Sequence, residues 1–147
     1  MTADQYLEMI TEKSKEVCGN YGLPYACCVA QGAIESEWGR YGIGNGGYNI
    51  FGRKWGGEGE YVEVKTQEDD GTGNLYTITA KFQSYNDIGD AINDWCHLMI
   101  WGPYKEFSDQ YKEDQNLESF VNGISGVYAT DIYYASKIMN TIRACDL

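Results

Sequence analysis

The stretch from Ala30 to Gly39, Ala-Gln-Gly-Ala-Ile-Glu-Ser-Glu-Trp-Gly, places a carboxylate inside an otherwise small and apolar helical segment. Burial disfavours the charged form of a carboxyl group, and a carboxyl that keeps its proton suits general acid chemistry. Because successive helical residues are about 100° apart, Glu35 and Glu37 point to different sides of the helix and cannot serve one site together. For an isolated helical glutamate a salt bridge is the commoner role, so Glu35 becomes the candidate acid only through the motifs downstream.

A glycine-rich segment follows this helix, which is expected to begin near Pro24 and to stop at Gly39. Between residues 39 and 59 glycine stands at positions 39, 42, 44, 46, 47, 52, 56, 57 and 59. This density excludes regular structure and indicates a loop whose backbone approaches another group closely. Asn49, Phe51 and Trp55 are its informative side chains, either as anchors of a linker or as part of a binding groove.

Two segments in the middle of the chain have the composition of β-strands. Residues 61–66 and 75–82 alternate or are rich in strand formers, and residues 69–74 between them are dense in turn formers. We therefore expect a β-hairpin lobe at about residues 58–83.

Helical patterns occupy most of the remaining chain. A capping box of Thr2 and Gln5 opens the first helix, which is expected to stop near Gly19. Asp87 is a candidate cap for a third helix that ends before Gly102 and carries His97, to which we assign a structural role. Two further helices are expected, at residues 117–124 and from Tyr134 onward.

Length and charge limit the class of protein. A chain of 147 residues suits one domain, residues 1–147, and can bury a substantial core. Tyrosine and tryptophan are abundant, at 13 and 4 residues, and both can stack on sugar faces. With 11 basic and 22 acidic residues, the formal net charge is −11, which argues against nucleic acid as a partner.

The cysteines and the single histidine argue against metal catalysis. Five cysteines, without C-x-x-C spacing, and one histidine leave few ligands for a metal site, so no metal and no cofactor are expected. Free thiols are the default, and a bridge from Cys18 to Cys145 is the alternative. The chain opens without a secretory signal pattern and has no run of about twenty apolar residues, so membrane insertion is not expected.

Four short motifs, in order, resemble those of one enzyme family. Residues 30–39 are similar to A-Q-x-A-L-E-S-x-W-G, residues 49–54 to N-L-F-G-x-K, residues 80–85 to A-x-F-R-x-Y, and residues 128–134 to Y-A-T-D-P-x-Y. These patterns are typical of the bacterial peptidoglycan N-acetylglucosaminidases, glycoside hydrolase family seventy-three, which includes autolysins and flagellar hydrolases. One such motif is weak evidence, but four in order are strong.

This resemblance implies a fold: a lysozyme-like α+β domain, mainly helical, with a small β-hairpin lobe flanking the substrate cleft. It also implies the activity of an endo-β-N-acetylglucosaminidase that cleaves peptidoglycan strands between N-acetylglucosamine and N-acetylmuramic acid. Glu35 is then the general acid. Glu68, in a hairpin segment similar to T-x-E-Y, is the candidate for the second catalytic carboxylate, although Asp69 replaces the motif's tyrosine. Tyr134 is expected beside Glu35, and substrate contacts are expected from Gln31, Asn49, Phe51 and Tyr128.

Two other functions stay open at this point. A muramidase or lytic transglycosylase would use a similar lone helical glutamate on the same polymer, and a non-catalytic module that binds cell-wall glycan would keep the groove without turnover. The expected partner is the glycan strand, the expected state is a monomer, and the expected place of action is the bacterial cell wall. Since no signal is seen, the chain is expected to be either an excised domain or a phage-type lysin (endolysin).

Overall fold

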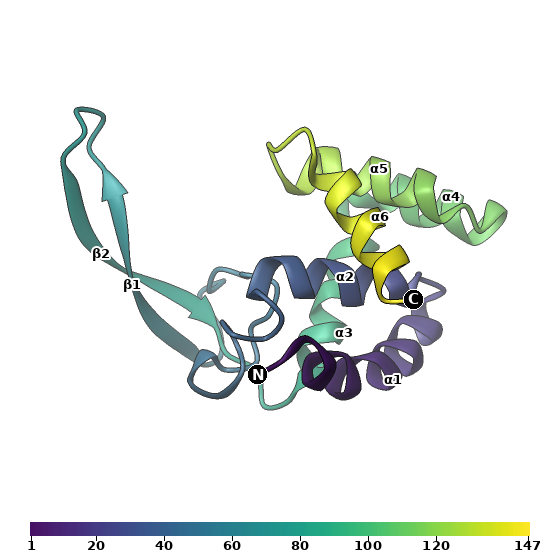
Figure 1. The fold of residues 1–147 in the computed structure, drawn as a ribbon, viewed down its shortest axis with the longest axis horizontal. Helices are drawn as coiled ribbons and strands as arrows, with labels where there is room; N and C mark the ends of the chain where they lie inside the picture. The colour runs from purple at the N-terminus through teal and green to yellow at the C-terminus, as the bar shows by residue number, and fades with distance from the viewer.

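The computed structural model describes the backbone of residues 1–147 and every side chain except that of Asn45. Its elements in chain order are α1 (Ala3–Tyr21), α2 (Tyr25–Ser36), the 3₁₀ turn η1 (Gly44–Gly46), β1 (Tyr61–Asp69), β2 (Leu75–Gln83), α3 (Ile88–Met99), the 3₁₀ turn η2 (Gly102–Tyr104), α4 (Lys105–Asp114), α5 (Leu117–Tyr128) and α6 (Tyr134–Ala144). Figure 1 shows a helical body from which the two strands extend as an arm. The mainly helical fold with a hairpin lobe is thus confirmed.

Helix α2 runs through the body between α1 and α6 (Figure 1) because its small residues let neighbours approach closely. Gly32 shows how close: a Cβ there would lie 2.5 Å from the Tyr6 hydroxyl oxygen and 2.8 Å from Cδ1 of Ile50. The Tyr6 hydroxyl donates a hydrogen bond to the carbonyl of Val29, 2.9 Å away. The helix is therefore a fixed support for the residues at its C-terminal end.

The end of α2 comes earlier than the sequence indicated. Ser36 is the last helical residue, and its hydroxyl donates to the Gly32 carbonyl (2.6 Å) while accepting from the amide of Gly39 (2.8 Å). Glu37 and Trp38, the next two residues, have φ angles of 49° and 60°. This left-handed turn reverses the chain directly after Glu35 and places that residue at a helix end.

The capping box of α1 is present, with Thr2 and Gln5 bonded reciprocally, but the helix continues to Tyr21 and ends at Gly22 in the left-handed conformation.

At the other end of the chain, α5 continues to Tyr128, four residues beyond the expected end, and α4 precedes it where no helix was expected. The core lies between these helices, and Trp95 of α3 is its largest fully buried side chain.

The hairpin is antiparallel and regular. Its register pairs Tyr61 with Gln83 at the base and Asp69 with Leu75 at the tip. The Asp69 carboxylate accepts hydrogen bonds from the amides of Gly71 (2.8 Å) and Gly73 (3.0 Å), which closes the turn. The expected lobe at residues 58–83 corresponds to this arm.

All five cysteines carry free thiols, and the alternative Cys18–Cys145 bridge is not formed. Cys18 instead lies beside Cys96 of α3, with the two sulfur atoms 3.7 Å apart in the core. Within the part of the chain that the structure describes, no helix is both long and apolar enough to cross a membrane.

Candidate active site

Glu35 is the penultimate residue of α2 and is half-buried. Its Oε1 accepts a hydrogen bond from the hydroxyl of Tyr134, the first residue of α6, at 2.6 Å. Burial, together with the bonded Glu35 carboxylate, raises the pKa of Tyr134, so the phenol remains a donor at neutral pH. The expected pairing of these two side chains, 99 residues apart, is therefore present in the structure.

Tyr128 supports this pair from the end of α5. Its ring stacks on that of Tyr134, with centroids 5.9 Å apart and planes 12° apart. Its hydroxyl donates to the Phe51 carbonyl at 2.7 Å. Burial, followed by the nearby Glu35 charge, raises the pKa of Tyr128. Tyr128 thus joins three parts of the site: α5, α6 and the glycine-rich loop.

Two pockets meet at Glu35. The hairpin-side pocket, of about 280 Å³, is lined by Glu35 and by Tyr41, Gly42, Gly46, Asn49, Gly52, Val62, Val64 and Phe82. The helix-side pocket, of about 400 Å³, is lined by Glu35 and by Phe51, Gly52, Arg53, Lys54, Leu98, Tyr104 and Tyr128. Glu35 and Gly52 belong to both. A polymer lying across this surface can therefore occupy space on either side of the carboxyl group.

Gly52 forms the bridge between the two pockets. Its φ is +67°, a conformation that side chains rarely adopt, and a Cβ placed there would lie 3.8 Å from Oε2 of Glu35. The glycine keeps the backbone of the loop next to the carboxyl oxygen that does not receive the Tyr134 hydrogen bond.

Asn49 holds this loop in place. Its Nδ2 donates to the carbonyls of Arg53 (2.7 Å) and Gln83 (2.9 Å), and its Oδ1 accepts from the amide of Arg53 (2.9 Å). The side chain borders the hairpin-side pocket but is only 8% exposed. Its amide therefore fastens the loop to the base of the hairpin, and the substrate contact expected of it stays a prediction.

Gln31 lies under the site, and Phe51 borders the helix-side pocket with a ring that is almost completely buried. Gln31 is fully buried, and its Oε1 accepts a hydrogen bond from the indole of Trp95 at 2.8 Å. The Phe51 ring, 2% exposed, stacks on the same indole with centroids 6.2 Å apart. In this arrangement the two side chains support the floor of the pockets, and the substrate contacts expected of them stay a prediction.

Glu68 is not beside Glu35. It stands opposite Tyr76, one pair from the tip of the arm. Since strand side chains alternate, Glu68 shares a face with Val62 and Val64, which line the hairpin-side pocket. At about 3.3 Å per residue it lies about 13 Å farther along the strand than Val64. Glu68 is thus on the side of the arm that borders the hairpin-side pocket, but only a movement of the arm or of the substrate can bring it to the reaction.

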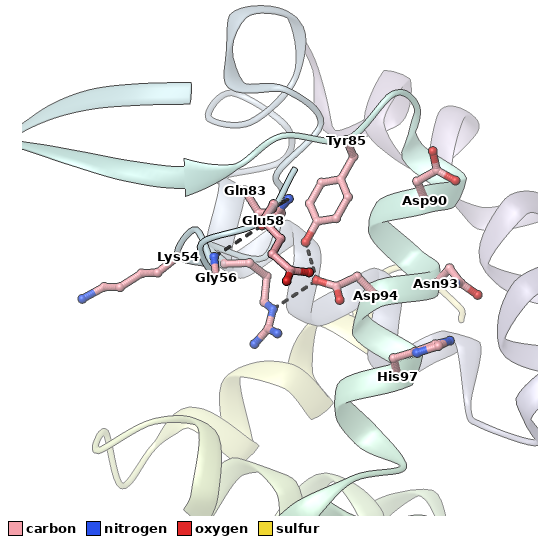
Figure 2. A pocket seen from close by; sticks show the side chains of 10 residues that line it. Lys54, Gly56, Glu58, Gln83, Tyr85, Asp90, Asn93, Asp94 and His97 are labelled. Carbon is pink, nitrogen blue, oxygen red and sulfur yellow. Dashed lines mark hydrogen bonds and ion pairs between the residues drawn. The ribbon is translucent and has the colours of Figure 1, made fainter. Parts of the chain in front are cut away.

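A third pocket, of about 450 Å³, lies next to the helix-side pocket and shares Arg53 and Lys54 with it. In Figure 2 the side chains of Tyr85 and Asp94 point toward each other in this pocket. The Tyr85 hydroxyl donates to Oδ2 of Asp94, and so does Nε of Arg53, at 3.2 Å. Burial, and then the bond to Asp94, raises the pKa of Tyr85.

The sequence interpretation did not identify this Tyr85–Asp94–Arg53 group. Tyr85 and Arg53 both fall inside matched motifs, which was the available signal, but nothing in the sequence indicated Asp94. As for metals, the described residues contain no group of three or more histidine, cysteine, aspartate or glutamate side chains placed to hold an ion.

A half-buried glutamate at a helix end, between two pockets and beside a hairpin lobe, defines a lysozyme-like glycoside hydrolase. Residues 11–147 match the model of the glucosaminidase family, described as mannosyl-glycoprotein endo-beta-N-acetylglucosaminidase. The chain belongs to this family, as its four motifs predicted.

Its relatives include named peptidoglycan hydrolases. The chain is 32% identical over 129 residues to peptidoglycan hydrolase FlgJ of Escherichia coli K12, an alignment that covers 83% of this chain and 40% of the relative. The catalytic domain of the autolysin Auto from Listeria monocytogenes superposes with a TM-score of 0.84 at 29% identity, over 98% of this chain and 84% of that one. A glycoside hydrolase domain of Salmonella typhimurium FlgJ gives 0.81 at 25% identity, over 99% and 98%. The chain thus spans less than half the length of the Escherichia coli relative.

Proposed function

We propose that the protein is an endo-β-N-acetylglucosaminidase that cleaves peptidoglycan strands between N-acetylglucosamine and N-acetylmuramic acid. The observation that carries the proposal is the position of Glu35, bonded to Tyr134 and open to a pocket on each side. Family membership supplies the activity, and the names of relatives such as peptidoglycan hydrolase FlgJ support the polymer.

In this mechanism Glu35 gives a proton to the glycosidic oxygen of the leaving sugar. Tyr134 fixes the carboxyl group through Oε1, so that the other oxygen lies next to Gly52, where the two pockets meet. Correct placement of such an acid is worth roughly 10² to 10⁴ in rate. Because both pockets are open, a strand can be bound in its middle, which supports endo cleavage.

The second group is either Glu68 or the substrate itself. If the arm bends toward α2, Glu68 can act as a base on water or can orient the reacting acetamido group. If the arm stays extended, the acetamido oxygen of N-acetylglucosamine attacks the anomeric carbon as Glu35 protonates the leaving oxygen, and water then opens the cyclic intermediate with Glu35 as the base. The distance between the two carboxyl groups in the reacting complex decides between inverting, retaining and substrate-assisted chemistry.

Product analysis tests the proposal. Purified peptidoglycan is digested, the products are reduced with borohydride, and the new end sugar is identified by mass spectrometry. Reduced N-acetylglucosamine is the expected result. Reduced N-acetylmuramic acid would identify a muramidase, an anhydromuramic product would identify a lytic transglycosylase, and wall binding without soluble products would indicate a binding module.

We place this activity at the bacterial cell wall, where the polymer is found, and propose that residues 1–147 act as one catalytic domain and as a monomer. Sedimentation of the active protein at the concentration of the assay tests the last point: a single species of about 17 kDa is expected.

A further inference from the structure

Positive charge at the site is confined to one of the two pockets beside Glu35. The described residues that line the hairpin-side pocket include no lysine, arginine or histidine. The helix-side pocket has Arg53 and Lys54 together with Glu35. In a chain whose formal net charge is −11, two basic residues in one pocket beside the catalytic carboxyl group are an exception. The helix-side pocket is therefore suited to a negatively charged substituent of the substrate.

Arg53 is held in a way that leaves part of its guanidinium group available. Its Nε donates to Asp94, and Asp94 is held in turn by the Tyr85 hydroxyl. Among the described residues, the bond from Nε to Asp94 is the one side-chain hydrogen bond of Arg53, and the guanidinium group lies close enough to Tyr85 to partly offset the rise in that phenol's pKa. The side chain is also only about one third exposed, at 34%. A guanidinium group fixed through one nitrogen can still offer its other two to a carboxylate, the geometry that arginine favours for such ligands.

We propose that the helix-side pocket binds the muramic sugar on the leaving-group side of the cut, and that Arg53 binds a carboxylate of that sugar's O3 substituent. This inference rests on the proposed function, because cleavage after N-acetylglucosamine puts a muramic sugar in the leaving position. The muramic sugar differs from N-acetylglucosamine by a lactyl ether at O3. Its carboxyl group is free where the peptide stem has been removed, and elsewhere it carries a stem that has carboxylates of its own.

The assignment gives the strand a direction across the site. The neutral N-acetylglucosamine unit that receives the cut lies in the hairpin-side pocket, against the apolar side chains of Val62, Val64 and Phe82. The charged sugar lies against Arg53 and Lys54. The family motif leaves the Arg53 position open, so this contact is a property of the present chain and not of the motif.

The neighbouring third pocket does not offer the carboxylate a better place. Figure 2 shows Glu58, Asp90 and Asp94 around it, whereas the Lys54 side chain extends away from them. Asp94 is already paired with Arg53, so Glu58 and Asp90 are left to repel an anion there. The carboxylate is therefore expected on the helix-side face of Arg53.

The test compares three preparations of glycan strand, with kcat and KM measured by release of reducing ends. One preparation has its stems removed by an amidase and carries free lactyl carboxylates, the second is the same material with these carboxyl groups converted to methylamides, and the third keeps its stems. The parent is expected to have a KM about tenfold lower for the free acid than for the methylamide, as one charge-assisted hydrogen bond allows. The Arg53→Gln variant is expected to lose this difference, so that its KM values for the free acid and the methylamide become similar.

Two variants make the comparison specific. Arg53→Lys keeps the charge and is expected to retain part of the preference for the free acid. Arg40→Gln is the matched control, because Arg40 is an exposed arginine whose ion pair with Glu37, at 3.8 Å, lies on the surface. It should behave as the parent does on every preparation. If Arg53→Gln raises KM more on stem-bearing strands, the contact is assigned to a stem carboxylate. If it raises KM more on stem-free strands, the contact is assigned to the lactyl group.

An equal rise in KM for Arg53→Gln on the acid and methylamide strands would overturn the proposal. Arg53 would then act only by holding Asp94 and the loop in place. So would a parent enzyme that does not distinguish the two strands. Failure of the proposed function is seen separately, as a different sugar at the new reducing end. The two ideas can therefore fail independently.

Discussion

Glu35 and Glu37 are two residues apart and have different surroundings. Glu35 is half-buried and bonded to Tyr134, while Glu37 is exposed and faces Arg40. The Glu35→Gln variant is expected to lose at least a hundredfold in kcat, because an amide keeps the shape but cannot deliver the proton. Binding to insoluble peptidoglycan should persist in a pull-down assay. Glu37→Gln is the control and should keep near-parent turnover; comparable turnover by Glu35→Gln would remove Glu35 from the mechanism.

Tyr134 contributes through its contact with Glu35. Replacing it by phenylalanine keeps the ring and its stacking on Tyr128 but removes the 2.6 Å hydrogen bond to Oε1. A hydrogen bond to a charged group is worth about 1.5 to 3 kcal/mol, so kcat should fall about tenfold or more, with little change in KM. Tyr133→Phe, at the neighbouring exposed tyrosine, is the matched control. Unchanged kcat in Tyr134→Phe would show that Glu35 needs no fixed partner.

The glycine-rich loop, as a structural element, depends on Asn49. An Asn49→Ala variant loses three hydrogen bonds to backbone groups and leaves those groups poorly solvated. The free energy of unfolding is expected to drop by about 2 kcal/mol or more, measured by urea denaturation. Asn122→Ala, on the exposed surface of α5, should change it by less than about 0.5 kcal/mol. A small effect at Asn49 would mean that the loop is held mainly by the Phe51 packing.

The arm is tested by three glutamates on β1 or just before it. If Glu68 acts in catalysis, Glu68→Gln should lose about a hundredfold or more in kcat, the scale of a positioned acid or base. Glu63→Gln points to the other face of the strand and should be near the parent. Glu60→Gln, outside the strand at its base, should be near the parent as well. Parent-like turnover by Glu68→Gln would leave Glu35 working with the acetamido group of the substrate.

Secondary structure was predictable where the sequence carries a periodic pattern, and not elsewhere. The hairpin and the cap of α1 were predicted because strand formers and capping residues act locally. Helix α4 was missed because Lys105–Asp114 is mostly polar. Its apolar residues, Phe107 and Tyr111, pack against α5, where the ring centroids of Tyr111 and Phe120 are 5.6 Å apart. Long-range packing of this kind leaves little trace in a local window.

The residues of the site also differ in how far the sequence could predict their roles. The approach of Tyr134 to Glu35 was expected from a motif resemblance, and periodicity alone could not have joined residues so far apart in the chain. The roles of Asn49 and Gln31 were harder to assign, because a motif records that a residue type is needed but not whether it faces substrate or supports the backbone. Asp94 had no motif at all, and its pairing with Arg53 is visible only once α3 is packed beside the loop.

At the scale of the whole molecule, the core contains an unusual number of thiols. Cys18, Cys27, Cys28 and Cys96 are all fully buried. Burial raises the pKa of Cys27 and Cys28, while contacts between the thiols and burial raise the pKa values of Cys18 and Cys96. A thiol in the unfolded chain titrates near about 8.5. Above that pH the unfolded chain has lost protons that the folded protein still binds, so stability must fall as pH rises.

This linkage predicts the pH dependence of thermal unfolding. The Tm should be nearly level from about pH 6 to 7, where the thiols are almost fully protonated in both states, and should fall steadily from about pH 8.5 upward. Burial also raises the pKa of Tyr6, which should steepen the fall above about pH 10. Differential scanning calorimetry with reductant present measures the curve. Cys27→Ala lowers Tm at neutral pH through the cavity it leaves, but removes one titrating group and should give a shallower alkaline slope. A Tm that stayed level to pH 10.5, or an unchanged slope in Cys27→Ala, would mean that the buried thiols do not control alkaline stability.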